Sequence, residues 1–510
     1  MAVTLFAAID VGSFDLEMTI YQIMDKGLIK PVEQLKQSVA AGHDTYNKGR
    51  ISYNHIEEIC NALLGFKQVM ESYHIKNYKA YGTSALREAD NRDIVIDQIK
   101  VRTGIDVTVL GNATQRFLSY KAIALKQKNF EEIIKTGTLI ADVGSGSTQL
   151  SVFDKDQLLF SQYMRLGTLR IREVFDTVSV DMHDNIGLIE DLIDADSQTF
   201  KRMYLKDRKI ENLIFAGLCA QLLGRQKNGR RKEVLSRTEF NALYEKITSM
   251  STYDLSRDMD ISMEYADLLL PGVMIYKKIV DITEAEKIWL PGVILTDGIV
   301  AEYALSEKMI RFGHDFNQDI LSSARSIAKR YKSNLKHGQN LETTALAIFD
   351  GMKKYHGLDK RERLLLQLAS ILHDCGKFVS ITDPANCAYY IITSTPIIGL
   401  SADEQKMVAN IVKYYSQDFD YEYLSEEGVD KLIVVAKLVA ILKVAGILDR
   451  SHKQKIQSVK CTIRNNELVL TSDAEGDILL EENLLESRAD FFEEVYGIRP
   501  VLRRKRNTRS

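Results

Sequence analysis

The chain has 510 residues, 45% apolar and 27% charged, and its 67 Lys and Arg against 70 Asp and Glu give a net charge of −3. This composition is typical of a globular protein of about three or four domains. Because positive and negative charges nearly balance, the net charge gives no signal for a specific nucleic-acid partner. Five scattered cysteines without a Cys-x-x-Cys pair argue against a disulfide framework, and no apolar stretch of about 18 residues occurs, so we expect a cytoplasmic protein without a membrane segment.

The first predicted elements are two similar β-hairpins. Residues 6–23 (FAAIDVGSFDLEMTIYQI) and 138–155 (TLIADVGSGSTQLSVFDK) share the tetrapeptide DVGS. In both, an apolar run precedes the tetrapeptide and an alternating pattern follows it, which predicts a hairpin with a Gly/Ser turn at its tip. One such turn is also typical of an ordinary hairpin. Two copies in matching contexts indicate two similar lobes that face each other.

The residues of these turns suit phosphate chemistry. Glycine lets backbone N–H groups approach a phosphate oxygen, serine adds a hydroxyl, and aspartate can hold a divalent metal. We therefore predict that a phosphate lies between the two lobes.

Between the hairpins, residues 78–99 predict a strand that ends at Gly82, followed by a helix. Thr83 and Ser84 are predicted to cap this helix, whose N-terminus favours an anion. Arg87 lies about one turn into the helix and could bind the same anion with two hydrogen bonds. The alternative is an ordinary capped helix with a solvated arginine.

Further strand and helix patterns follow the second hairpin. A helix is predicted after Gly167 and Thr168, a strand–turn–helix unit over residues 213–224, and a helix after Gly298 that closes the second lobe. This alternation of strands and helices indicates an α/β fold.

The motifs AAIDVGS, GTSALREADNRD, ADVGSGST, RLGTLR and LTDGI occur in this order over residues 1–305. In these motifs the chain resembles the exopolyphosphatase and guanosine pentaphosphate phosphatase (Ppx/GppA) family, which has an actin-like fold. The resemblance implies an α/β protein with two actin-like (ribonuclease H-like) lobes, an all-α HD-like domain and a small α/β C-terminal piece. The corresponding boundaries are residues 1–125, 126–306, 316–455 and 456–510.

The resemblance also implies an activity. Members of the family remove the terminal phosphate from inorganic polyphosphate, or the 5′ γ-phosphate from the guanosine polyphosphate pppGpp, by attack of water that a carboxylate orients. It further implies Mg²⁺ near Asp142 and Asp10 and a homodimer. The phosphate-binding residues it implies are Gly12, Ser13, Thr83, Ser84, Arg87, Gly144, Ser145, Gly146, Ser147 and Thr148.

Two positions depart from the family pattern. The family's catalytic glutamate falls on Gln115, and the glutamate that follows its second Gly/Ser loop falls on Gln149. Glutamine cannot accept a proton at neutral pH, and loss of a general base typically costs on the order of 10²–10⁴ in rate. We therefore expect weakened hydrolysis, unless Asp15, Glu17 or Glu88 compensates.

Two alternatives remain for the function. The first is a non-catalytic regulator that binds polyphosphate or a guanosine polyphosphate and transmits the signal through its helical half. The second is an ATP-dependent kinase or chaperone-like ATPase of the same superfamily, which the GTSALREADN segment disfavours.

The second half predicts helices from about residue 316. Its His373-Asp374 pair, with His337 upstream, resembles the metal ligands of HD phosphohydrolases. A histidine of the family pattern is replaced by Tyr415 and an aspartate by Gly446. Asp449 and His452 of the pattern remain. Partial binding of a metal by His337, His373 and Asp374 is one interpretation. The one that we favour is loss of the metal, with His373 and Asp374 left to form structural hydrogen bonds.

The C-terminal segment predicts a hairpin that turns at Asn465-Asn466, then a helix and a basic tail. The tail carries Arg503, Arg504, Lys505 and Arg506. We expect it to be solvated or to touch a polyanion, and the basic cluster at residues 225–232 has the same two interpretations.

Overall fold

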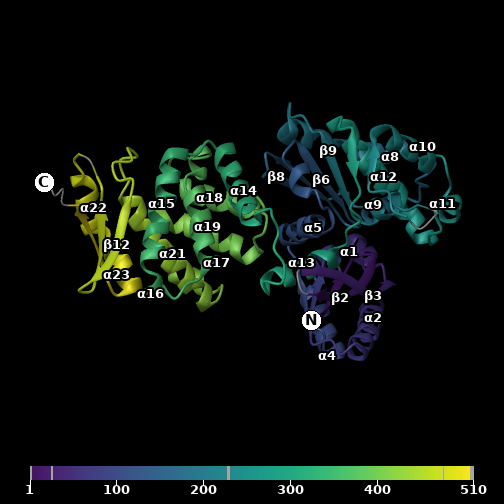
Figure 1. Cartoon of the computed structure of the whole chain (residues 1–510), viewed down its shortest axis with the longest axis horizontal. Coiled ribbons are helices and arrows are strands. Elements are labelled where there is room, and N and C mark those ends of the chain that lie inside the picture. The colour runs from purple at the N-terminus through teal and green to yellow at the C-terminus, as the bar shows by residue number, and fades with distance from the viewer. Residues whose placement is uncertain (1–2, 25–26, 227–229, 475, 506–510) are drawn as a thin grey trace. The chain divides into compact units, whose positions relative to one another are not determined.

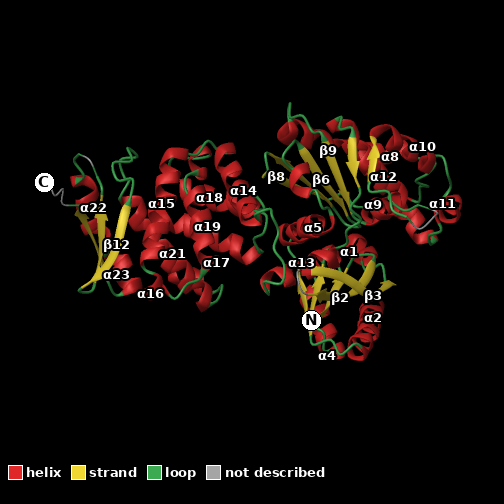
Figure 2. Cartoon of the chain, viewed as in Figure 1, coloured by secondary structure: helices red, strands yellow, loops and turns green. Residues whose placement is uncertain are grey.

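The computed structural model describes residues 3–24, 27–226, 230–474 and 476–505. Its internal contacts divide the chain into two compact units, residues 1–319 and 320–510. Strands occur in the first unit and near the C-terminus of the second (Figures 1 and 2). In the described part of the chain, no helix combines the length and hydrophobicity that a membrane crossing requires.

The first lobe of unit 1 is built on a five-stranded sheet with the strand order β3-β2-β1-β4-β5. β1, β2 and β3 are antiparallel neighbours, whereas β4 and β5 continue the sheet in parallel. The strands are β1 (Thr4–Val11), β2 (Asp15–Met24), β3 (Leu28–Ser38), β4 (Asn77–Gly82) and β5 (Val107–Val109). The helices are α1 (Gly42–Lys48), α2 (Tyr53–Ser72), α3 (Ser84–Glu88), α4 (Arg92–Thr103), α5 (Asn112–Lys126) and α6 (Phe130–Ile133).

Helix α2 shows how the sequence builds this lobe. The hydroxyl of Ser52 caps its N-terminus by accepting a hydrogen bond from the backbone N–H of His55. Ile56, Leu63 and Met70 recur at helical spacing and are buried in the core with β1 and β4.

The second lobe repeats this topology on a sheet with the order β10-β11-β9-β6-β7-β8. β6, β7 and β8 are antiparallel like β1, β2 and β3, and β9 and β11 follow in parallel. The strands are β6 (Thr138–Val143), β7 (Thr148–Asp154), β8 (Gln157–Met164), β9 (Asn212–Ala216), β10 (Val234–Ser236) and β11 (Lys287–Trp289). The helices of this lobe are α7 (Thr168–Val178), α8 (Ile186–Phe200), which continues into a π-helical turn (Lys201–Leu205), α9 (Leu218–Leu223), α10 (Arg237–Thr248), α11 (Thr252–Met259) and α12 (Met263–Thr283). Helix α13 (Leu295–Ser306) follows them in the chain.

Helix α13 differs from its sequence-based placement in the second lobe. It packs against α5, β1 and β2, and its Ile299 and Val300 share a buried cluster with Phe6 and Leu118. The apolar residues around most of this helix explain the packing, because only a fully covered position can bury them. The chain thus returns to the first lobe before unit 2 begins.

Unit 2 is mainly helical, as predicted, and α14 begins at Phe316. The apolar residues of unit 2 recur at helical spacing, for example Leu365, Leu368 and Leu372 in the helix Lys360–Leu372, all of them buried. The helices are α14 (Phe316–Arg330), α15 (Leu335–Gly351), α16 (Lys353–His356), α17 (Lys360–Leu372), α18 (Pro384–Ser394), α19 (Ala402–Ser416), α20 (Tyr421–Ser425), α21 (Val429–Ile447), α22 (Leu479–Arg488) and α23 (Asp490–Tyr496), with a 3₁₀ turn at Cys375–Phe378.

A three-stranded sheet, β12-β13-β14, ends the described chain. The hairpin of β12 (Val459–Arg464) and β13 (Glu467–Ser472) turns at Asn465 and Asn466, both with positive φ, as predicted. The first residues of the predicted basic tail lie instead in a strand, β14 (Arg499–Arg504), which is parallel to β13. The guanidinium of Arg503 binds the carboxylate of Glu467 at 3.1 Å. Arg506 lies outside the described residues.

The basic cluster at residues 225–232 is described only in part, because residues 227–229 lie outside the described chain. Arg225 and Arg231 form an isolated β-bridge, and Lys232 binds the carboxylate of Glu239 at 2.6 Å. Its described cations are thus partly engaged within the second lobe.

Candidate active site between the two lobes

The two DVGS segments form hairpin turns of the same geometry. The N–H of Gly12 donates to the carbonyl oxygen of Asp15 at 3.0 Å, and the N–H of Gly144 donates to that of Ser147 at 2.9 Å. Asp10 precedes the first turn. In the second lobe Asp142 holds the same place. The predicted duplication of the hairpins is confirmed at the level of single hydrogen bonds.

Both turns line one polar cavity of about 160 Å³. The start of α3, the first turns of α5, the β9–α9 junction and residues 293–295 also contribute to its wall. The structure thereby gathers residues that lie far apart in the sequence. The predicted site residues that line the cavity are Asp10, Gly12, Ser13, Thr83, Ser84, Gln115, Asp142, Gly144, Ser145, Gly146, Ser147 and Gln149.

Two predicted phosphate ligands, Thr148 and Arg87, are not among the lining residues. The buried hydroxyl of Thr148 donates to the carbonyl oxygen of Leu166 at 2.6 Å and thus ties β7 to the loop before α7. The guanidinium of Arg87 donates to the carbonyl oxygen of Leu110 at 2.9 Å and to Gln115 Oε1 at 3.2 Å. Arg87 is therefore connected to the cavity by its hydrogen bond to Gln115, which lines the cavity.

The predicted capping of α3 by Thr83 is wrong. The Thr83 side chain makes no capping hydrogen bond, and its hydroxyl points to the carbonyl oxygen of Val11. Ser13 takes the capping place instead, because its Oγ accepts a hydrogen bond from the N–H of Ala85 at 3.0 Å. The first hairpin turn is thus bound directly to the start of the helix.

Tyr46 of α1 is a neighbour of the phosphate loops that sequence spacing did not reveal. Its hydroxyl donates to Ser13 Oγ at 2.8 Å and lies 3.0 Å from Ser84 Oγ. A side chain at Gly146, in the opposite lobe, would place its Cβ 2.0 Å from this hydroxyl. A larger residue at position 146 would displace the Tyr46 side chain, so glycine here permits the close approach of the two lobes.

The carboxylates of the cavity are electrostatically unfavourable in the ionised form. Burial raises the pKa of Asp10 well above its usual range, and the nearby carboxylates of Glu17, Asp15 and Asp142 raise it further. Burial likewise raises the pKa of Asp142, although the hydroxyl of Ser119 donates to Asp142 Oδ2 at 2.7 Å and opposes the shift.

Ser119 could have been found from the sequence, because it lies four residues after Gln115 and hence on the same face of α5. The sequence indicates Glu17 only as one of three acidic residues that could compensate for the missing glutamates. Burial raises the pKa of Glu17 too, against a hydrogen bond from Gln34.

A divalent cation fits this arrangement. Asp10 Oδ1 is buried and has no hydrogen-bond partner among the described residues, although several carboxylates surround it. Across the described chain, no three His, Cys, Asp or Glu side chains come together as a metal-binding group. Mg²⁺ does not need three, because it is usually bound by one or two carboxylates, waters and phosphate oxygens. Asp10 and Asp142 can supply the two carboxylates.

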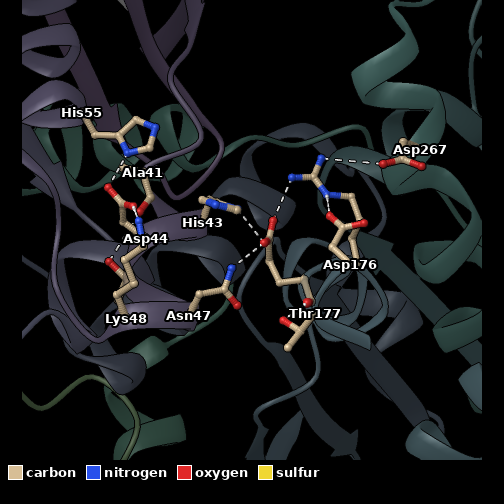
Figure 3. Close-up of polar contacts among 12 residues, drawn as sticks. Ala41, His43, Asp44, Asn47, Lys48, His55, Asp176, Thr177 and Asp267 are labelled. Carbon is tan, nitrogen blue, oxygen red and sulfur yellow. Dashed lines mark hydrogen bonds and ion pairs between the residues drawn. The ribbon is translucent and has the colours of Figure 1, made fainter. Parts of the chain in front are cut away.

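The two lobes are also joined by polar contacts between α1 and α7. Figure 3 shows His43 and Asn47 of α1 turned toward α7, which carries Asp176. There, buried Glu173 Oε2 binds His43 Nδ1 at 2.6 Å and accepts a hydrogen bond from the Asn47 amide at 2.7 Å. Arg172 donates to Oε1 of the same carboxylate at 2.8 Å. Glu173 therefore links the helices of both lobes.

In unit 2, the predicted ligands His337, His373 and Asp374 lie close together. Nε2 of both histidines is buried without a hydrogen-bond partner in the described chain, whereas other atoms of the three side chains contact protein groups. The rings of the two histidines are 5.0 Å apart. His337 Nδ1 binds the carboxylate of Asp449 at 2.7 Å. Lys377 forms an ion pair with Asp374 at 2.6 Å. A lysine ammonium group thus stands beside the carboxylate that the sequence suggested as a metal ligand.

The two departures from the family pattern in this region contact each other. A Cβ at Gly446 would lie 2.2 Å from the hydroxyl oxygen of Tyr415, and burial raises the pKa of that hydroxyl to about 12. The tyrosine ring fills the space that a side chain at 446 would need. The aromatic replacement and the glycine therefore depend on each other sterically.

Comparisons with known proteins agree with this geometry. The model of the Ppx/GppA phosphatase family matches residues 19–307, and that of Ppx/GppA phosphatase domain III matches residues 321–490. A guanosine-5′-triphosphate,3′-diphosphate pyrophosphatase from Photobacterium profundum is 21% identical over 478 residues, which is 92% of either chain. A relative with the same name from Vibrio parahaemolyticus is 20% identical over 478 residues, again 92% of either chain.

Solved structures show the same fold. A Ppx/GppA family member from Aquifex aeolicus has a TM-score of 0.50 at 18% identity and covers 60% of this chain and 99% of its own. An exopolyphosphatase from Cytophaga hutchinsonii has a TM-score of 0.51 at 18% identity, with 60% and 98% covered. The helical half corresponds to domain III of the family. Because the first family model spans more than half of the sequence, this protein belongs to the Ppx/GppA phosphatase family.

Proposed function

We propose that the protein is a phosphohydrolase that releases the terminal phosphate of a phosphoanhydride chain, inorganic polyphosphate or pppGpp, by attack of water. One observation carries the proposal: two Gly/Ser turns and the start of α3 meet at one polar cavity that also contains Asp10 and Asp142. The names of its relatives support it, since these are guanosine pentaphosphate pyrophosphatases and an exopolyphosphatase.

In this proposal, serine hydroxyls from both lobes bind the phosphate oxygens. Ser13 and Ser84 come from the first lobe, and Ser145 and Ser147 from the second. Asp10 and Asp142 would hold Mg²⁺, which would neutralise charge on the terminal phosphate. The side-chain amides of Gln115 and Gln149 are too weakly basic to take the proton of the attacking water.

A non-catalytic regulator is the second candidate. It is favoured by the two amides at positions 115 and 149, and by Gln149 Oε1, which is buried without a hydrogen-bond partner in the described chain. Such a protein would bind the polyanion between its lobes and release no phosphate.

The experiment that separates the two candidates measures phosphate release and binding side by side. Purified full-length protein with Mg²⁺ receives long-chain polyphosphate in one series and pppGpp in another. Steady release that Asp142→Asn abolishes supports the hydrolase. Tight binding without release supports the regulator, and the double variant Gln115→Glu/Gln149→Glu should then gain turnover. Neither binding nor release of either compound would contradict both candidates.

We further propose that domain III is an HD-type helical domain that has lost its metal, within the domain division 1–125, 126–306, 316–455 and 456–510. Support comes from the adjacent His337 and His373 and from the ion pair of Asp374 with Lys377. Metal analysis after dialysis against Mn²⁺ tests the loss. Bound Mn²⁺ that His373→Ala removes, while Asp142→Asn retains it, would contradict it.

A further inference from the structure

The two hairpins place one side chain directly opposite each cavity aspartate. In the first lobe Asp10 pairs with Glu17, and in the second Asp142 pairs with Gln149. Directly opposed residues on antiparallel strands project on the same face of the sheet. Glu17 and Gln149 therefore occupy equivalent places at the two sides of the cavity, and both line it. The carboxylate is present in the first lobe and absent from the second.

The surroundings of Glu17 hold one of its oxygens and leave the other available. The side chain is buried, with only 9% of the residue exposed, and it lines the cavity beside Asp10. The amide of Gln34 donates to Glu17 Oε1 at 2.6 Å and thereby fixes the orientation of the carboxylate. Within the described residues, no hydrogen bond to Oε2 is found. This oxygen can accept a hydrogen bond from a water in the cavity.

The other two acidic residues near the site are occupied. Asp15 Oδ1 accepts hydrogen bonds from Ser38 at 2.7 Å and Tyr265 at 3.0 Å, and its Oδ2 forms an ion pair with Lys36 at 2.9 Å. Asp15 thus has hydrogen-bond or ion-pair partners on both oxygens.

Glu88 is not among the residues that line the cavity. Its Oε2 binds Arg165 at 3.1 Å and Arg170 at 2.8 Å, and its Oε1 accepts a hydrogen bond from Tyr163 at 3.3 Å. Of the three compensating carboxylates, Glu17 is therefore the one that both lines the cavity and has an oxygen without a hydrogen bond in the described chain.

We propose that Glu17 is the catalytic carboxylate of this site and replaces, from the first lobe, the carboxylates absent at positions 115 and 149. The inference rests on the proposed function. The water oxygen forms a bond to the terminal phosphorus while its proton passes to Glu17 Oε2. The bond from this phosphorus to the bridging oxygen breaks, and the electron pair stays on the shortened chain. Glu17 then returns the proton to solvent.

The test compares wild-type protein, Glu17→Gln and the exchange variant Glu17→Gln/Gln149→Glu, all at full length with Mg²⁺. Phosphate release is measured from polyphosphate and from pppGpp, and binding of the same compounds by calorimetry. We expect Glu17→Gln to lose 10²–10⁴-fold in release, the range for loss of a general base, and to bind no more weakly than wild type. The exchange variant should recover at least tenfold, because its carboxylate returns at the equivalent position of the second hairpin.

Glu33→Gln is the matched control. Glu33 lies on β3, outside the cavity lining, and accepts a hydrogen bond from the hydroxyl of Tyr73 at 3.0 Å. This variant should release phosphate within threefold of wild type. Should Glu17→Gln fail to fold, Glu17→Asp takes its place, with an expected loss of at least tenfold because the carboxylate is withdrawn by one methylene.

The outcomes separate the two claims. Release by wild type that Glu17→Gln leaves within threefold would overturn the role of Glu17 and keep the proposed hydrolase. No release by wild type from either compound would overturn both. A loss in Glu17→Gln that parallels an equal loss of binding would also contradict a role in the chemical step.

Discussion

At Asp10, the requirements of a metal site and of a stable fold oppose each other. Its Oδ1 is buried without a hydrogen-bond partner in the described chain, and burial raises the pKa of this carboxyl, which three neighbouring carboxylates raise further. A group in such surroundings is kept at the expense of stability. We therefore predict that Asp10→Asn stabilises the metal-free protein by about 1 kcal/mol while it lowers phosphate release by about a hundredfold or more.

Thermal unfolding in EDTA and phosphate release with Mg²⁺ check this pair of opposite changes. Asp154→Asn is the control, because Asp154 ends β7 away from the cavity lining and its replacement should change neither quantity. An Asp10→Asn variant that is less stable than wild type in EDTA would show that the ionised carboxylate is not strained by its neighbours.

At the scale of single elements, Gly446 and Tyr415 form a steric pair between α21 and α19. Replacement of a helical glycine by alanine normally stabilises by about 1 kcal/mol. Here the added Cβ would lie 2.2 Å from the tyrosine hydroxyl oxygen and 2.6 Å from its Cε2. We predict that Gly446→Ala instead destabilises unit 2 by about 1–3 kcal/mol, the usual cost of overpacking.

The background variant Tyr415→Leu tests the cause. Without the ring, the same Gly446→Ala change should become neutral or stabilising in urea unfolding. Equal costs in both backgrounds would mean that the helix backbone, and not the tyrosine ring, excludes a side chain at this position.

The contact between α1 and α7 leads to another prediction. Glu173 binds His43, Asn47 and Arg172, and only 2% of the glutamate is exposed. Glu173→Ala removes the acceptor that these three groups share, so we expect a loss of about 1–3 kcal/mol in the free energy of unfolding. Asp176→Ala on the same helix, which removes one exposed partner 3.8 Å from Arg172, should cost less than about 0.5 kcal/mol. Urea unfolding of both variants checks the difference.

The elements that the sequence predicted are those with local signals. The two hairpins follow from apolar alternation around Gly12 and Gly144, and the turn at Asn465 from its residue type. The parallel strand β14 was missed because its pairing with β13 is non-local and its arginines look like a solvated tail. The packing of α13 on the first lobe was not predicted, because the sequence of an apolar helix does not indicate which sheet it packs against.

The sequence motifs predicted the residues of the candidate site that lie within them. Residues of the site outside any motif were not predicted. Asp10, Asp142 and the serines of both turns meet at one cavity, as the matching tetrapeptides indicated. Tyr46 and Gln34 lie in segments without a motif, and only tertiary packing brings them to Ser13 and Glu17.

At the scale of the whole molecule, the two lobes share one topology, and the second adds β10 at its edge. This duplication explains why the same register pairs Asp10 with Glu17 and Asp142 with Gln149. A residue at one of these places has an equivalent in the other lobe, so a carboxylate can be exchanged between lobes without a change of backbone.

Acid should affect the two units of the chain in opposite directions. In unit 2, burial and the neighbouring His337 lower the pKa of His373 from 6.5 to about 4, and burial also lowers that of His452. In unit 1, burial lowers the pKa of His314, but the hydrogen bonds to Asp319 and Asp156 outweigh this effect, so the pKa of His314 is raised. Burial also raises the pKa of Asp10.

The sign follows from proton uptake. Below pH 6.5 the unfolded chain protonates the histidine at position 373 before folded unit 2 does, so the stability of unit 2 falls as pH drops from about 6.5 toward 4. At 1.36 kcal/mol per pH unit, His373 alone accounts for about 2 kcal/mol at pH 5. His314 and Asp10 bind protons more tightly in folded unit 1, so they favour unit 1 as pH falls over the same range.

Urea unfolding at pH 7 and pH 5 can follow both units, because the chain has a single tryptophan and this residue, Trp289, lies in β11 of unit 1. Its fluorescence should report a transition that acid does not weaken, while far-UV circular dichroism, which includes the helices of unit 2, should show an earlier one at pH 5. In His373→Gln the acid shift of this earlier transition should shrink by about 2 kcal/mol. An unchanged shift in that variant would assign the acid sensitivity of unit 2 to groups other than its buried histidine.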